Sequence, residues 1–165
     1  AEPPYRRLAR EALGNLAAWP SEGRVGAGFG AVAGSRPGGI GIARAEVAGG
    51  AVAAIVAVNS FGEVGTPMAG EVPMPKAAIP GTNTTIGAVV TDLPLTRAAA
   101  KRIAMMAHDG LARSIRPIHT PFDGDTLFAL GLSPETPAAV DPLLLAHLGT
   151  VAADCVAEAV LRAVN

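Results

Sequence analysis

The chain has 165 residues, of which 50% are hydrophobic and 16% are charged, so it can bury a sizeable core as one domain. Aromatic residues make up only 4%, and we therefore expect a core built mainly from alanine and valine. The 13 basic and 14 acidic residues form no runs, which argues against nucleic-acid and membrane-surface partners. So apolar a composition predicts that further surface is covered in a homo-oligomer.

The first half of the sequence predicts one helix followed by strands. Residues 4–19 place apolar side chains at intervals of three and four, as an amphipathic helix does. Glycine at every second position over residues 24–31 predicts a strand with one bare face. Residues 38–45 are expected to form the second strand of that hairpin, and the apolar run 51–59 predicts a fully buried strand. Residues 62–80, rich in proline and glycine, predict an exposed connector.

The second half predicts two strands and two long helices. The strands are expected at residues 84–91 and 126–130. Thr96 is the expected N-cap of the first helix, which ends before Pro117, and residues 142–164 form the second helix. The expected buried face of this last helix consists of Leu144, Leu148, Val151, Cys155, Ala159 and Arg162. These elements suit an α+β layered sandwich in a single domain.

The cysteine content and the motifs that the sequence lacks bear on its cellular location and on metal binding. The single cysteine, Cys155, falls within a helical pattern, where we expect a buried, unreactive thiol. No signal-peptide pattern opens the sequence, and no charge-free apolar run reaches the roughly 18 residues of a membrane span. The expectation is a cytoplasmic protein. There is no HExxH or CxxC spacing for zinc and no GxSxG elbow for a serine hydrolase.

One stretch has the composition of a self-cleaving peptide bond. In Gly-Thr-Asn-Thr-Thr-Ile-Gly at residues 81–87, the Thr84 hydroxyl can attack the carbonyl of Asn83. Hydrolysis of the resulting ester would leave Thr84 as a new N-terminus, whose amine can act as a base. The same residues are also ordinary for a turn that leads into a strand, so on their own they leave both interpretations open.

Three motifs in a fixed order give this stretch a context. Residues 83–87, 106–113 and 119–126 resemble the self-processing aminopeptidases and amidases, which include D-aminopeptidases of the DmpA type, β-aminopeptidases and nylon-oligomer hydrolases. The resemblance implies the layered αββα sandwich of N-terminal-nucleophile hydrolases, in the variant shared with ornithine acetyltransferase. It also implies an α-subunit region 1–83, a β-subunit region 84–165 and a tetramer. Family members are about twice this length, so part of the fold and pocket is expected upstream.

The resemblance also implies roles for three further residues. Asn59 corresponds to an asparagine that donates its side-chain amide to the oxyanion of the acyl intermediate. Asp123 and Asp125 correspond to an aspartate pair beside the nucleophile, and we assign them to orienting Thr84 and holding its α-ammonium. From the residues alone this pair is also consistent with a solvated turn. A calcium loop would need oxygen ligands that residues 127 and 129 do not supply.

Other residues near these motifs receive structural interpretations. We expect His108 to serve helix packing and His119 to anchor the turn before Asp123. The family often has a lysine before the Gly-Gly pair at residues 38–39, where this chain has Pro37 next to Arg36. The sequence leaves open whether Arg36 replaces that charge.

Three hypotheses for function follow. The first is a self-processing hydrolase of small peptides or amides, acting through an acyl-Thr84 intermediate without metal or cofactor. The second is a truncated or inactive relative that serves as a subunit or requires an upstream polypeptide. The third is an acyltransferase on the same fold, which is weaker because the residues around Thr84 resemble the hydrolase motif. Intact mass separates the first two, and acyl transfer to an amine acceptor separates the third.

Overall fold

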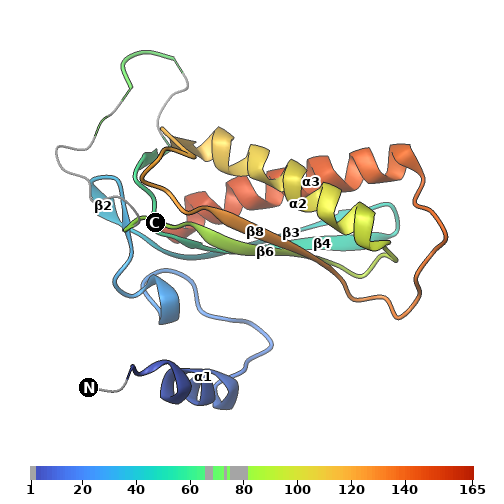
Figure 1. Cartoon of the computed structure of the whole chain (residues 1–165), viewed down its shortest axis with the longest axis horizontal. Coiled ribbons are helices and arrows are strands. Elements are labelled where there is room, and N and C mark those ends of the chain that lie inside the picture. Colours follow the sequence, from blue (N-terminus) through green and yellow to red (C-terminus); the bar gives the residue numbers. More distant parts are fainter. Residues whose placement is uncertain (1–2, 66–68, 73, 75–81) are drawn as a thin grey trace.

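The chain forms a layer of two helices on one face of a four-stranded sheet (Figure 1). The computed structural model describes residues 3–65, 69–72, 74 and 82–165. The sheet has the strand order β3 (Gly39–Val47), β4 (Gly50–Val58), β6 (Ile86–Thr91) and β8 (Thr126–Gly131). The pairs β3–β4 and β4–β6 are antiparallel, whereas β6 and β8 are parallel. Helices α2 (Arg97–Ser114) and α3 (Pro142–Ala163) cover this sheet, so the α+β class is confirmed.

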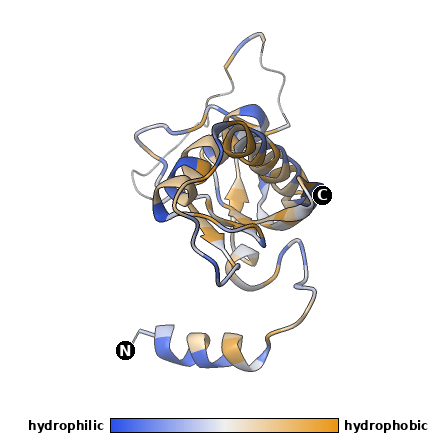
Figure 2. Cartoon of the chain, turned by 90° about the vertical axis from the view of Figure 1, so that its right-hand side faces the viewer, coloured by the Kyte–Doolittle hydropathy of each residue, from blue (hydrophilic) through white to orange (hydrophobic). Residues whose placement is uncertain are grey.

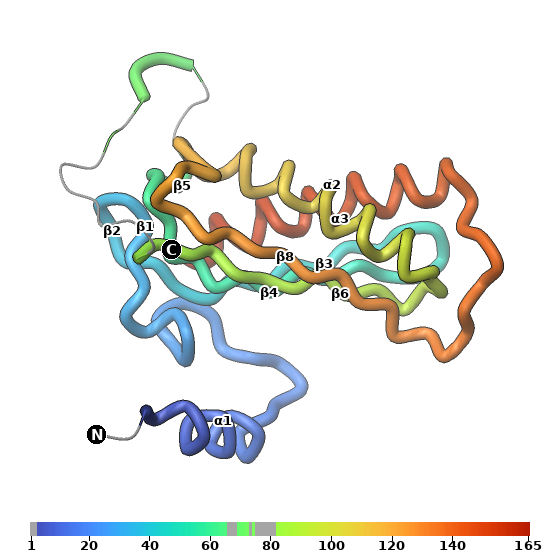
Figure 3. The backbone as a smooth tube through the Cα atoms, in the orientation of Figure 1, coloured from blue at the N-terminus to red at the C-terminus, as the bar shows by residue number. Residues whose placement is uncertain are grey.

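Short elements surround this body, as the tube in Figure 3 shows. They are α1 (Tyr5–Gly14), the 3-10 turn η1 (Gly26–Gly28), β1 (Val32–Ala33), β2 (Arg36–Pro37), β5 (Glu63–Val64) and β7 (Ile115–Arg116). Strands β1 and β2 pair with each other, as do β5 and β7. The expected connector 62–80 therefore contains a short strand at its start, and its residues 66–68, 73 and 75–80 lie outside the described part of the chain.

Capping residues fix where the two long helices begin. The Thr96 side chain accepts a hydrogen bond from the amide of Ala99 at 3.0 Å, which confirms the predicted N-cap of α2. Asp141 caps α3 in the same way, and Pro142 occupies the first turn, where its missing N–H leaves no donor unused. Predicted and observed bounds of both helices agree closely.

The core lies between the helices and the sheet and consists largely of valine and alanine, as predicted. Val52, Val56 and Val58 of β4 are almost completely buried against Val156 and other residues of α3. Small residues bring the two layers close together. A Cβ atom at Gly41 would overlap the carbonyl oxygen of Ala159, so only glycine allows this approach. Arg162, predicted on the buried face of α3, is exposed and pairs with Glu158 at 2.8 Å.

The opposite face of the sheet carries an apolar row that the described residues leave uncovered. Register places Ile42, Ile55, Ala88 and Phe128 side by side across the four strands. Phe128 is 54% exposed and Ile55 is 36% exposed. The prediction that residues 51–59 are fully buried is therefore wrong for one face, because the helices cover only the other. The chain thus supplies one helical and one sheet layer of the expected αββα sandwich.

Two predictions for the first forty residues are also wrong. Residues 24–31 form no strand, because Gly26 has a φ of +49° and turns the chain into η1. Strand β3 instead pairs with β4. The expected helix over residues 4–19 ends at Gly14, and none of its residues is buried. Figure 2 shows α1 set apart from the layered body.

One described helix, α3, is long and apolar enough to cross a membrane by length and composition. Its residues Leu148, Ala152, Val156 and Ala159 are buried, however, where α3 packs against α2, β3 and β4. A helix with this burial is the core helix of a layered domain.

Candidate active site

The predicted site residues from distant parts of the sequence meet at one edge of the sheet. Thr84 lies just before β6, and Asp123 and Asp125 lie just before β8. Because β6 and β8 are neighbours and parallel, their starting ends lie together, with Ile86 opposite Thr126. A further bridge between Asn83 and Asp123 continues this pairing past the ends of the strands.

The carbonyl oxygen of Asn83 is held by two donors. The Thr84 hydroxyl donates to it at 2.8 Å, and the backbone amide of Gly124 donates to it at 2.9 Å. If the Thr84 hydroxyl added to this carbonyl carbon, negative charge would develop on the oxygen that Gly124 already contacts. The arrangement places a nucleophile and an oxyanion donor on the same peptide bond.

Sequence reasoning did not assign a role to Gly124. A Cβ atom at this position would lie 2.8 Å from the Thr84 hydroxyl oxygen, closer than Cβ contacts normally are. Glycine therefore leaves room for the hydroxyl. The only signal in the sequence was the glycine between two aspartates, which is equally typical of a simple turn.

Asn59 lies within the site, as expected, but its side chain is used differently. Its backbone carbonyl accepts a hydrogen bond from the amide of Thr84 at 2.7 Å. Its side-chain amide donates to the carbonyl oxygen of Thr82 at 3.0 Å, and its side-chain oxygen accepts from the Val32 amide at 2.9 Å. Asn59 thus fixes the segment that leads to Thr84, and its role as an oxyanion donor stays a prediction.

The carboxylate of Asp123 organises its own turn. One oxygen accepts from the backbone amide of Phe61 at 3.0 Å. The other accepts from the backbone amide and the hydroxyl of Thr120, at 3.0 and 2.6 Å. Phe61 also stacks on Phe122 with ring centroids 4.9 Å apart. These contacts tie the turn before β8 to the end of β4.

The carboxylate of Asp125 is buried, with only 1% of its side chain exposed. One oxygen accepts from the backbone amide of Thr85 at 2.9 Å, and the other lies 2.9 Å from Nδ1 of His119. Among the described residues of the uncleaved chain, neither aspartate accepts a hydrogen bond from Thr84. The role predicted for them concerns an α-amine that exists only after cleavage, and it stays a prediction.

Two histidines extend this group. Nε2 of His119 lies 3.3 Å from Nδ1 of His108, which reaches the site from α2. Burial lowers the pKa of His108, and the nearby His119 lowers it further, against smaller opposing effects of Asp125 and Asp109. The sequence suggested only packing and anchoring for both residues. His119 and Asp125 belong to the same motif, but the motif does not show that His119 contacts Asp125 or that His108 reaches His119 from α2.

The remaining candidates have structural partners. The Arg36 guanidinium donates to the carbonyl oxygen of Val64 at 3.0 Å. Cys155 is buried, as predicted, and its burial raises the pKa of the thiol, with a further increase from Asp154. Within the described ranges, no cluster of three or more histidine, cysteine or acidic side chains has the arrangement of a metal site.

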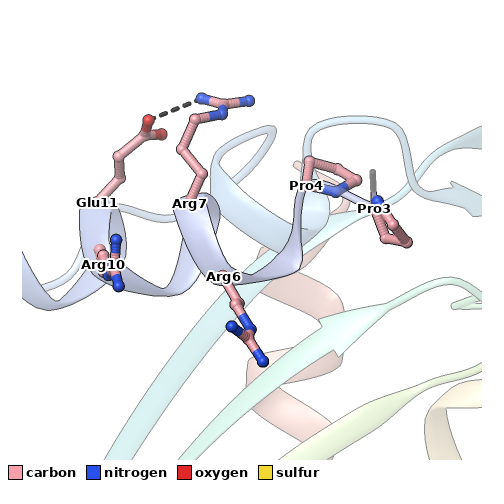
Figure 4. A pocket seen from close by; sticks show the side chains of 6 residues that line it. All are labelled: Pro3, Pro4, Arg6, Arg7, Arg10 and Glu11. Carbon is pink, nitrogen blue, oxygen red and sulfur yellow. Dashed lines mark hydrogen bonds and ion pairs between the residues drawn. The ribbon is translucent and has the colours of Figure 1, made fainter. Parts of the chain in front are cut away.

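A hollow of about 540 Å³ beside α1 is unrelated to these residues. Pro3, Pro4, Arg6, Arg7, Arg10 and Glu11 line it (Figure 4). Its ion pair, between Arg7 and Glu11 at 2.7 Å, is exposed and contributes little to stability. The one carboxylate among its lining residues, that of Glu11, is taken up by this ion pair, and Thr84 and the aspartates lie elsewhere, at the sheet edge.

Comparison with known proteins shows several relatives. An uncharacterized aminopeptidase of Mycobacterium leprae is 41% identical to this chain, over an alignment that covers 93% of this chain and 51% of that protein. A crystal structure of a protein from Pyrococcus horikoshii has a TM-score of 0.76 at 27% identity, covering 96% of this chain and 48% of the other. The chain thus spans about half the length of the relatives it matches.

A second similar structure identifies the fold. The L-aminopeptidase D-Ala-esterase/amidase of Ochrobactrum anthropi, described as a variant of the Ntn-hydrolase fold, has a TM-score of 0.73 at 27% identity. The match covers 93% of this chain and 47% of that protein, which agrees with the predicted fold. The model of peptidase family S58 matches residues 6–165. The chain therefore belongs to peptidase family S58.

Proposed function

We propose that this chain carries the catalytic residues of a hydrolase that cleaves its own Asn83–Thr84 bond and then uses Thr84 as an N-terminal nucleophile on amides of small peptides. The observation that carries this proposal is the Asn83 carbonyl oxygen, which accepts hydrogen bonds from both the Thr84 hydroxyl and the Gly124 amide. The names of the relatives, aminopeptidase and esterase/amidase, support the same class of reaction.

Self-cleavage proceeds by an acyl shift. The Thr84 oxygen adds to the carbonyl carbon of Asn83, and the Gly124 amide stabilises the oxyanion. The carbon–nitrogen bond then breaks, its nitrogen takes up a proton in place of the one that the Thr84 hydroxyl gave up, and Asn83 remains attached to Thr84 as an ester. Water hydrolyses this ester to the Asn83 carboxyl group, the free hydroxyl and the α-amine of Thr84.

Turnover reuses the same atoms. The α-amine of Thr84 accepts the hydroxyl proton as the oxygen attacks the substrate carbonyl, and this proton then passes to the leaving amine. Water releases the acyl group in a second step. The carbonyl of Asn59 contacts the Thr84 nitrogen at 2.7 Å in the uncleaved chain and provides one acceptor for the new amine. Asp123 and Asp125 are the charged groups proposed to hold it.

The test uses the full-length polypeptide that contains this chain. We expect a mass spectrum with a cut between Asn83 and Thr84, and amide hydrolysis only after that cut. Thr84→Ala should remain uncut and inactive, whereas Thr84→Ser should retain some cleavage because the hydroxyl survives. A polypeptide that stays whole and still hydrolyses amides would refute the mechanism. One that is whole and inert would favour the inactive-relative hypothesis.

Replacing the aspartates tests the turnover step when the rate is counted per cleaved polypeptide, because the contacts of Asp125 also lie beside the cleavage site. Asp123→Asn or Asp125→Asn should lower this rate by orders of magnitude, and the melting temperature measured in parallel separates loss of chemistry from loss of fold. Wild-type turnover in both variants would assign the pair a purely structural role. Transfer of the acyl group to an added amine, in place of water, would instead favour the acyltransferase hypothesis. Sedimentation tests the homo-oligomer, which the apolar row on the open sheet face supports.

A further inference from the structure

We propose that His119 is a positioning residue. It holds the Asp125 carboxylate in contact with Thr85, which lies between the nucleophile Thr84 and the start of β6. The inference rests on the proposed function, since it matters for catalysis only if Thr84 reacts. It concerns a residue to which neither the family motif nor the sequence analysis assigns a part in the reaction.

Both oxygens of Asp125 have a partner. Oδ1 accepts from the Thr85 amide at 2.9 Å, and Oδ2 lies 2.9 Å from Nδ1 of His119. A carboxylate held at both oxygens cannot rotate about its last bond without breaking one of these contacts. Because only 1% of the Asp125 side chain is exposed, water cannot readily replace the histidine.

Oδ1 of Asp125 contacts Thr85, the residue next to the nucleophile. Thr85 follows Thr84 directly, so the Thr85 amide fixes the position of the peptide unit that carries the Thr84 side chain. Asp125 follows Gly124, which donates to the Asn83 carbonyl. A shift of the Asp125 carboxylate would therefore move the nucleophile and the oxyanion donor relative to each other, and shifts of this kind slow a reaction strongly.

The backbone of His119 has an unusual conformation that aims its ring. Its φ is +55°, in the left-handed region that non-glycine residues seldom adopt, although asparagine and histidine do so more often than most. An asparagine at this position can keep both the backbone conformation and a side-chain N–H donor. A glycine keeps the backbone conformation and removes the donor.

The contact with the Asp125 carboxylate, which can only accept, requires His119 to carry a proton on Nδ1, and His108 is the neighbour of its other nitrogen. When neutral His119 donates from Nδ1 to Asp125, its Nε2 is an acceptor, and it lies 3.3 Å from Nδ1 of His108. Because burial lowers the pKa of His108, that ring is neutral at pH 7 and can donate from Nδ1. The titratable groups acting on His108 are His119, Asp125 and, on α2 itself, Asp109. The contacts thus run from His108 on α2 through His119 and Asp125 to Thr85, just before β6.

The experiment compares His119→Asn with His119→Gly in the full-length polypeptide, with His147→Asn on the exposed surface of α3 as the control. We expect self-cleavage in the asparagine variant and the control to stay within about threefold of wild type. The glycine variant should be slower by about 10- to 100-fold, the loss typical of a hydrogen bond to a charged group.

A second measurement does not depend on the chemistry. In the Thr84→Ala background, which cannot cleave, hydrogen exchange of the Thr85 amide reports its contact with Asp125. We expect exchange about tenfold faster or more with glycine at position 119 than with asparagine. Equal exchange and equal cleavage in the two variants would overturn the inference. Faster exchange with glycine in a protein whose wild type never cleaves would overturn the proposed function and leave the positioning by His119 intact.

Discussion

A single methyl group at Gly124 should slow self-cleavage without unfolding the protein. In Gly124→Ala the new Cβ would lie 2.8 Å from the Thr84 hydroxyl oxygen, whereas ordinary contacts begin at 3.4 Å. The hydroxyl must therefore move by 3.4 minus 2.8, or 0.6 Å, or leave its hydrogen bond to the Asn83 carbonyl. Displacements approaching 1 Å cost up to about 100-fold in rate, so we expect cleavage slower by roughly 10- to 100-fold.

Stability should change little, because the other atoms near this Cβ are 3.8 Å away and Gly124 has no positive φ. The assay is a time course of the two fragments on a denaturing gel, with the melting temperature measured in parallel. Gly30→Ala is the matched control, since a Cβ there meets no atom within 4 Å. If Gly124→Ala cleaved as fast as Gly30→Ala, the hydroxyl position described here would not be the reactive one.

Two further predictions concern stability. Gly41→Ala should destabilise the fold by about 1–3 kcal/mol or more, because its Cβ would overlap the backbone carbonyl of Ala159 and no side-chain rotation relieves that contact. Urea unfolding measures this, and a loss no greater than that of Gly30→Ala would contradict the close packing of β3 on α3. Because the pKa of His108 is lowered on folding, the unfolded chain binds this proton more readily, so stability is greatest above about pH 6.5 and falls as the pH drops below it. His108→Gln should flatten the decline in melting temperature between pH 7 and 5, and an unchanged slope would assign it to other groups.

The long elements were predictable because each is encoded by local pattern. Thr96 caps α2 as expected, and the short apolar run at positions 86–91, rich in branched residues, predicts β6 directly. The strand predicted at residues 24–31 failed because alternating glycines indicate close packing as readily as they indicate a strand. That packing does occur: a Cβ at Gly28 would lie 2.6 Å from the backbone of Gly39.

The site was predictable only where a motif identified it. Thr84, Asp123 and Asp125 are close in space because β6 and β8 pair in parallel, a long-range fact that no local pattern contains. The same pairing brings in the Gly124 amide and, through Asp125, the ring of His119. A backbone donor has no residue type to reveal it, and a histidine within a motif can be assigned to packing until its neighbours in the fold are known.

If the Asn83–Thr84 bond breaks as proposed, the order of strands in the sheet determines when it can do so. Strands β3 and β4 precede Thr84 in the chain, whereas β6, β8 and both long helices follow it. The β4–β6 ladder, from Val52 opposite Thr91 to Ala57 opposite Ile86, therefore crosses the cut. Neither fragment would contain both α3 and the β3–β4 pair that α3 covers, so a nascent chain has to bring these parts together before the reactive geometry exists. If the proposed cleavage takes place, the two fragments could then separate only by unfolding, and a cleaved chain would be one that had folded correctly.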